Sequence, residues 1–548
     1  MPDLLIRGPL VLRSADAPPL ERIDLRIQAG RIVEMGRGLR GRESDRVIDA
    51  ADGIVIPGLV NAHAHTYETF NRGGVPAAPM EIWALYGHPV LGNRPRTPDE
   101  VYWRTLVPCL EMLRNGVTSV VDDVSLYFDF RDELVEAIMQ AYRDAGIRAW
   151  VSVKLMDRPL LATLPVDRGR VPRSILRELG RVRLPDGRAL MSWMRRIMRR
   201  EDRLGGIARV IPNPSAPQRC TDALLRGIHR LAVERDFPFV IHVQETRLQA
   251  VQGPRTYGTS MIGHLERLCV LTERTSIMHG VWLDDDDVTR IAAAGATVVH
   301  NPASNLKLGS GLASLRQLLH AGVNVALGCD GTSSNDGQSI LEAMKLAALV
   351  HHVTDPDYRR WLTPSEVFRM ATSGGARAAR WDTAIGTIES GRRADMVLLD
   401  RRTPAFSPLN DPIAQLVYAE SGHAVRMVIV DGRIVVEEGR PVTADLGKAC
   451  DRLQEIGERL RVERARTFAI ARRLEPRWRE MIAGAHDTPL PIERLAWGTS
   501  RTATTVTKAG RRPRRRSSDN DRTDPSDDES RDASVRSRSR PSRVRRIR

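Results

Sequence analysis

The chain has 548 residues, is 42% hydrophobic and carries a formal net charge of +15. This composition predicts a globular protein with one large catalytic domain, while the lack of an uncharged run of about 20 residues and of a signal-peptide pattern argues against membrane association. The five cysteines are odd in number and widely scattered, which favours reduced thiols and a cytoplasmic location over a disulfide framework.

Both ends of the catalytic region read as short strands. Residues 3–56 alternate between apolar and polar positions with glycine at the turns, and a similar pattern returns after residue 390. Within the second stretch, Asp431-Gly432 is a hairpin signal. We therefore predict that residues 1–56 and 386–445 pair into one composite β-sandwich domain.

The middle of the chain alternates strand and helix. This alternation predicts an α/β fold, a (β/α)₈ barrel over residues 57–385. The expected strands are 60–65, 118–123, 148–153, 208–212, 239–245, 276–280, 297–302 and 324–330.

Two further segments follow the sheet domain. Residues 446–490 have regularly spaced charges and predict amphipathic helices, which pack on the body or on a second subunit of a possible homo-oligomer. We expect residues 491–548 to form a disordered basic tail, because the stretch from Arg501 onward holds most of the excess positive charge and almost no apolar residues. A polyanion-binding arm is the alternative, but no aromatic residues interleave with the arginines to stack on bases, so nucleic-acid binding is disfavoured.

Polar side chains gather at the predicted strand ends. His63 and His65 in "VNAHAH" share one face of a strand because side chains alternate with period two. Strand five carries His242 and Glu245, and strand six ends in His279. His300 and Asp330 end strands seven and eight. Active-site groups of such barrels lie at the carboxyl ends of the strands, so these residues are the candidate site.

Five motifs occur in order: "PGLVNAHAH", "IHVQET", "HNPASNLKLGSG", "LGCDGTSSND" and "RMATSGGARAARWDTAIGTIESGRRADMVLLD". Together they resemble the amidohydrolase superfamily, in particular its mononuclear branch of cytosine deaminase-like, S-adenosylhomocysteine deaminase-like and triazine hydrolase-like enzymes.

The resemblance, which spans about residues 1–445, implies a metal site. The implied ligands are His63, His65, His242 and Asp330. Three imidazoles and one carboxylate suit one divalent ion, Zn²⁺ or Fe²⁺. The resemblance further implies that Glu245 shuttles protons and that His279 hydrogen-bonds the attacking hydroxide or the new oxyanion.

Lys154 bears on the number of metals. Dinuclear members of the superfamily use a carboxylated lysine at the end of strand four, but Lys154 follows strand three and strand four has no lysine. We therefore expect one metal.

Other polar residues near the strand ends are expected to be structural. His300 should bond to backbone, and Asp122 and Asp123 should be solvated carboxylates or should support the metal ligands. Loop-shaping roles are expected for Asn301, Asn305, Asn335 and Asp336, packing or stacking on substrate for Trp83, Tyr86 and Trp282, and no role for His88, His264, His320, His351 and His352.

These features predict a metal-dependent hydrolase that deaminates a small nitrogen heterocycle and releases ammonia, with purine, pterin, pyrimidine or triazine rings as options. The alternatives are removal of chloride or an alkylamine, opening of a cyclic amide, and a non-catalytic polyanion-binding protein. Ser215 stands where adenosine-type deaminases carry a histidine, and Val153 stands where they carry an arginine. We therefore expect S-adenosylhomocysteine to bind weakly.

Overall fold

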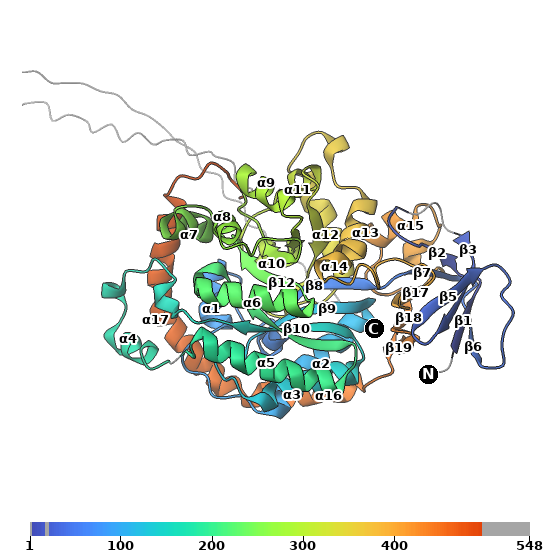
Figure 1. The fold of residues 1–548 in the computed structure, drawn as a ribbon, viewed down its shortest axis with the longest axis horizontal. Coiled ribbons are helices and arrows are strands. Elements are labelled where there is room, and N and C mark those ends of the chain that lie inside the picture. The colour runs from blue at the N-terminus through green and yellow to red at the C-terminus, as the bar shows by residue number, and fades with distance from the viewer. Residues whose placement is uncertain (1–2, 17–20, 183, 496–548) are drawn as a thin grey trace, which may run out of the picture. The chain divides into compact units, whose positions relative to one another are not determined.

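The structure is a computed structural model that describes residues 3–16, 21–182 and 184–495 (Figure 1). Most of the predicted basic tail, residues 496–548, lies outside this part of the chain. Within the described ranges, no helix is long and apolar enough to cross a membrane.

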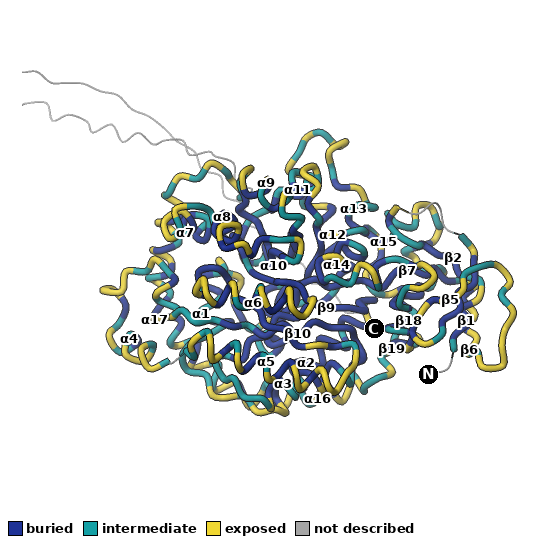
Figure 2. Tube along the Cα trace, in the orientation of Figure 1, coloured by how far each residue is buried: buried dark blue, intermediate teal, exposed yellow. Residues whose placement is uncertain are grey.

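Two parallel sheets form the middle of the molecule, and their alternation with helices fits the predicted α/β class. One sheet has the order β11 (Ala208–Pro214), β10 (Arg148–Leu155), β9 (Val117–Val124), β8 (Leu59–His65), β16 (Asp330–Gly331), and the other has the order β12 (Phe239–Val243), β13 (Thr275–His279), β14 (Thr297–His300), β15 (Asn324–Leu327). All eight residues of β9 are buried, as expected for a parallel strand covered on both faces. Figure 2 shows this buried interior in dark blue around β9 and β10.

The predicted eighth strand is split because the chain changes partners. β15 pairs with β14, whereas β16 pairs with β8. Between them, Gly328 N donates to His300 O at 3.0 Å and Cys329 N donates to His63 O at 3.1 Å. The two sheets adjoin here, and they adjoin again where His242 N donates to Ser215 O at 3.3 Å.

Helices cover these sheets, and several begin at side-chain caps. Thr97 and Glu100 form a capping box on α2, and Asp284 and Asp287 form another on α9. The helices from residue 80 to residue 378 are α1 (Met80–Gly87), α2 (Pro98–Arg114), α3 (Asp132–Ala145), α4 (Arg173–Leu179), α5 (Gly187–Leu204), α6 (Asp222–Arg235), α7 (Arg247–Tyr257), α8 (Met261–Arg267), α9 (Asp285–Ala293), α10 (Pro302–Lys307), α11 (Leu315–His320), α12 (Ile340–His352), α13 (Pro364–Ala371) and α14 (Ser373–Ala378).

Strands from both ends of the catalytic region share one mostly antiparallel sheet. Its order is β20 (Arg440–Pro441), β19 (Arg433–Glu437), β18 (Val425–Val430), β17 (Met396–Asp400), β7 (Gly53–Pro57), β2 (Leu10–Val11), β3 (Glu21–Arg22). A second sheet has the order β5 (Arg31–Gly36), β4 (Asp24–Gln28), β1 (Asp3–Arg7), β6 (Asp45–Asp49). One apolar core, with Leu25, Val55 and Leu398 among its members, joins the two sheets. The hairpin predicted at Asp431-Gly432 links β18 and β19, with positive φ at both residues.

The helical extension packs on the body of the molecule. It consists of α16 (Leu446–Arg459) and α17 (Arg461–His486), and α15 (Pro412–Tyr418) precedes it in the chain. α17 contacts α1 and α7. The predicted tail boundary at residue 491 is wrong, because Arg494 donates to the carbonyls of Val281 and Leu283 and accepts from Leu312 N.

Candidate metal centre

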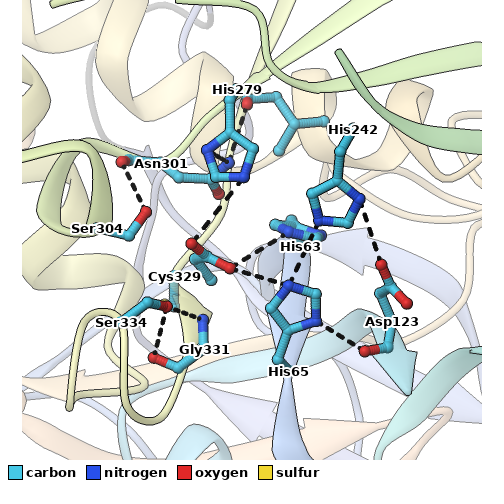
Figure 3. Close-up of polar contacts among 12 residues, drawn as sticks. His63, His65, Asp123, His242, His279, Asn301, Ser304, Cys329, Gly331 and Ser334 are labelled. Carbon is cyan, nitrogen blue, oxygen red and sulfur yellow. Dashed lines mark hydrogen bonds and ion pairs between the residues drawn. The ribbon is translucent and has the colours of Figure 1, made fainter. Parts of the chain in front are cut away.

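Four side chains from three strands converge on one point (Figure 3). β8 supplies His63 and His65, β12 supplies His242, and β16 supplies Asp330. Asp330 Oδ1 lies 3.1 Å from His65 Nε2 and 3.4 Å from His63 Nε2. His65 Nε2 lies 3.4 Å from His242 Nε2. The four residues that the resemblance implies as ligands are therefore brought together.

Backbone carbonyls fix the protons on two of these rings. Nδ1 of His65 donates to Asp123 O at 2.7 Å, and Nδ1 of His242 donates to Ser215 O at 2.9 Å. In the neutral rings, both Nε2 atoms then carry lone pairs that face each other. Within the described part of the chain, neither ring nitrogen of the buried His63 has a hydrogen-bond partner. Facing lone pairs beside a carboxylate are the donor set of a divalent cation, so these residues fit a metal ion.

Backbone geometry turns three side chains at the strand ends. His279, Asp330 and Gln244 have φ of +69°, +62° and +48°. This left-handed region is uncommon outside glycine and clusters at functional sites. Asp330 O is held by Gln338 Nε2 at 2.8 Å.

Glu245 and His279 lie beside the cluster. Nε2 of His279 is 3.9 Å from Glu245 Oε2 and 4.0 Å from Asp330 Oδ2. Nδ1 of His279 lies 2.9 Å from the amide oxygen of Asn305. Burial raises the pKa of the Glu245 carboxyl to about 7. A carboxyl with this pKa can both accept and release a proton near neutral pH.

A cavity of about 550 Å³ opens at the cluster. Its wall includes His65, His242, Glu245, His279 and Asp330, so the predicted catalytic and metal-binding groups face one space. His63 lies behind them and is fully buried.

Lys154 lies within β10 rather than after it. Its Nζ atom is 3.5 Å from Asp123 Oδ2, which also lies 3.5 Å from His242 Nδ1. Strand four, β11, contains no lysine, as the sequence indicates. Lys154 therefore neutralises the carboxylate beside a metal-facing histidine.

Sequence reasoning missed Glu68 and His88, both of which line the cavity. His88 Nε2 lies 2.7 Å from Glu68 Oε1, and the fully buried Glu68 also accepts from Ser333 N and Oγ. His88, for which the sequence predicts no role, thus lines the cavity and pairs with Glu68. The sequence does contain a pattern that points to Glu68. Glu68 follows His65 by three residues, just as Glu245 follows His242 by three residues.

The prediction that His300 bonds to backbone is wrong. His300 is buried, and among the described residues neither of its ring nitrogens has a hydrogen-bond partner; its ring packs 5.4 Å from that of His351. Asp122 and Asp123 are buried, so the solvated alternative is wrong, whereas Asp123 contacts His65 and His242 as the supporting alternative predicts. Asp122 accepts from Thr66 N, Thr66 Oγ1 and Tyr142 OH, so it anchors the segment after β8.

Among the aromatic candidates, Trp83 lines the cavity. The Trp282 indole is buried and donates to Ser310 O at 2.7 Å, and the Tyr86 hydroxyl donates to Glu475. Both are packing residues.

Ser215 and Val153 are not the only positions that decide which charged groups face the cavity. Ser215 does line the cavity, and Val153 is fully buried. However, Arg158, Arg168 and Arg219 also line it, so charged side chains are present at other positions.

Residues 54–435 match the model of the amidohydrolase family. The chain belongs to the amidohydrolase family. It is 33% identical to a 5-methylthioadenosine/S-adenosylhomocysteine deaminase of Syntrophobacter fumaroxidans, over 84% of this chain and 98% of that protein. This confirms the predicted resemblance and the prediction of a hydrolase of carbon–nitrogen bonds other than peptide bonds.

Two solved structures are similar to this amidohydrolase. A zinc-bound adenosine deaminase from Xanthomonas campestris is 26% identical, with a TM-score of 0.74, covering 84% of this chain and 99% of the other. An atrazine chlorohydrolase from Arthrobacter aurescens TC1, complexed with zinc, is 26% identical, with a TM-score of 0.74, covering 83% of this chain and 100% of the other. These similarities and the His/Asp cluster support a divalent metal.

Proposed function

We propose that this amidohydrolase removes an exocyclic amine from a nitrogen heterocycle and releases ammonia. The observation that carries the proposal is the meeting of metal-facing groups and the Glu245 carboxyl in one cavity. The family assignment supports a hydrolase over the non-catalytic alternative.

The proposed site holds one ion, Zn²⁺ or Fe²⁺, on His63, His65, His242 and Asp330. Four ligand atoms within one small cluster support this assignment. A bound divalent ion makes water a stronger acid, with its pKa lowered toward about 7. The ion pair of Lys154 with Asp123 supports one metal rather than two, since that lysine is engaged with a carboxylate.

Glu245 and His279 are the proposed proton-handling residues. Glu245 would carry one proton from the attacking water to a ring nitrogen and a second proton from the new hydroxyl group to the leaving amine, so both protons of the water are accounted for. Nδ1 of His279 donates its proton in a hydrogen bond to the amide oxygen of Asn305. The other ring nitrogen, Nε2, is then free to accept a hydrogen bond from the water. When protonated, Nε2 donates to the developing oxyanion.

The substrate ring belongs to the same proposal. The deaminase relatives support an adenosine-derived ring. The atrazine chlorohydrolase supports the second candidate, hydrolytic loss of chloride or an alkylamine from a triazine. Weak binding of S-adenosylhomocysteine stays a prediction.

A panel assay tests these candidates. Purified protein would be incubated with adenosine, 5-methylthioadenosine, S-adenosylhomocysteine, guanine, cytosine, a pterin, an aminotriazine and atrazine, with ammonia and chloride measured separately. We expect ammonia from at least one ring and much slower release after Glu245→Gln. Chloride from atrazine without ammonia from any ring would replace deamination by dehalogenation, and efficient turnover of S-adenosylhomocysteine would overturn the prediction of weak binding.

We further propose that the two parallel sheets form one closed (β/α)₈ barrel over residues 57–385. The backbone bonds at both sheet junctions support closure. The shared core of the end sheets supports a β-sandwich of residues 1–56 and 386–445. A cytoplasmic location is supported by five free thiols.

A further inference from the structure

The cavity is larger than a single heterocycle needs. Its volume of about 550 Å³ lies in the range of pockets that bury drug-sized ligands. A ring held at the metal cluster therefore leaves part of the cavity for another portion of the substrate.

That remaining part has an apolar wall built by α17 and residues 160–182. α17 contributes Ile470, Leu474 and Trp478, and residues 160–182 contribute Leu161 and Leu176 among others. We call this surface the α17 wall. Its members pack into one apolar cluster that also includes residues of α1.

The α17 wall holds a single charged side chain among its described residues. That side chain is Arg168, which is exposed and donates to Leu161 O at 2.9 Å. The other cavity arginines, Arg158 and Arg219, belong to the segments that follow β10 and β11. An apolar group therefore meets matching surface on the α17 wall, whereas a charged group would lose its hydration there.

The α17 side of this wall also lies outside the residues that match the family model, whereas residues 160–182 lie within them. The amidohydrolase match ends at residue 435, before α16 begins at Leu446. The metal cluster thus lies within the residues that match the family model, while Ile470, Leu474 and Trp478 of the wall belong to the helical extension.

We propose that the α17 wall is a subsite for an apolar substituent of the substrate, an alkyl or thioalkyl chain on the heterocycle or its sugar. This rests on the proposed deamination and adds the substrate class. Leu474 and Trp478 are its specificity-determining residues, because they bring large apolar side chains from the extension into the cavity.

Two homologous series test the subsite. One consists of 5′-alkylthio-5′-deoxyadenosines with methyl, butyl and hexyl chains, and the other of aminotriazines with the same alkyl chains. Each methylene buried on the wall should raise kcat/KM about fourfold until the wall is filled. A carboxybutylthio compound serves as the charged competitor and should be the poorer substrate.

Variants of α17 show whether this helix causes the rise in kcat/KM with chain length. Leu474→Ser and Trp478→Ala should flatten the dependence on chain length, and Leu474→Met should retain most of it because it conserves volume. Arg466→Ala, at an exposed position of the same helix, is the matched control. Metal content and melting temperature show that each variant is folded.

The outcomes separate the two proposals. No ammonia from any member of either series, or from the wider panel, overturns the deamination and the subsite with it. Turnover with kcat/KM independent of chain length, or a preference for the carboxylate, overturns the subsite alone and leaves the deamination standing.

Discussion

His279 is held by Asn305 through a 2.9 Å hydrogen bond between Nδ1 and the amide oxygen, which leaves Nε2 facing Glu245 and Asp330. Asn305 comes from α10, after the strand that neighbours β13, so a residue that the sequence predicts only to shape a loop orients the side chain of a proposed catalytic residue.

Asn305→Ala should lower kcat by about 10- to 100-fold, the usual cost of losing a partner that orients a site histidine. Steady-state kinetics on the ring identified by the panel would measure this, with metal content as the control. An unchanged kcat would show that packing alone orients the His279 ring.

Asp330→Asn should abolish metal retention while the protein stays folded. Asparagine tolerates the left-handed backbone at this position, where φ is +62°, so this variant removes the charge with less strain than alanine would introduce. We expect elemental analysis to find one metal per wild-type chain and almost none in the variant. Two metals per wild-type chain would contradict the mononuclear site.

Glu245→Gln should keep the metal and lower the rate by about 10²- to 10⁴-fold. The amide keeps the shape of the side chain but cannot carry protons, which is the contribution expected of a general acid–base group. Single-turnover measurements on metal-loaded protein would check this. Normal turnover would remove Glu245 from the mechanism.

Two truncations should differ sharply. Removal of residues 501–548 should leave activity and melting temperature nearly unchanged, because this composition predicts no core. Removal of residues 491–548 also takes away Arg494, whose guanidinium and carbonyl bond to the backbone near β13 and α11, and should lower the melting temperature. Differential scanning calorimetry compares the two, and a large loss from the shorter truncation would assign the tail a structural role.

The sequence predicts which residues stand at the strand ends of this site, because each of them lies at or just after a short apolar run. His63, His65, His242 and Asp330 all stand at positions that a parallel α/β arrangement brings to one edge. Periodicity carries this information locally, so the strands were found within a few residues.

Contacts made across the fold could not be predicted in the same way. His88 reaches Glu68 because α1 ends above the segment after β8, and Arg494 bonds to carbonyls that lie far away in sequence. Local sequence patterns do not encode contacts between residues that are far apart in the chain. His300 shows the reverse error, since a polar residue at a strand end was assumed to have a partner and is instead buried without one.

Because β7 pairs with β17, the sheet that contains both strands can be completed only late in synthesis of the chain. β7 leaves the ribosome early, but its antiparallel neighbour emerges only after residues 58–395 have been made. Until then, the buried strand Gly53–Pro57 has an open edge that could pair with another chain. The middle of the nascent chain can fold before β17 is made. We therefore expect the amino-terminal strands to become protected from proteases later than the residues that follow them in the chain.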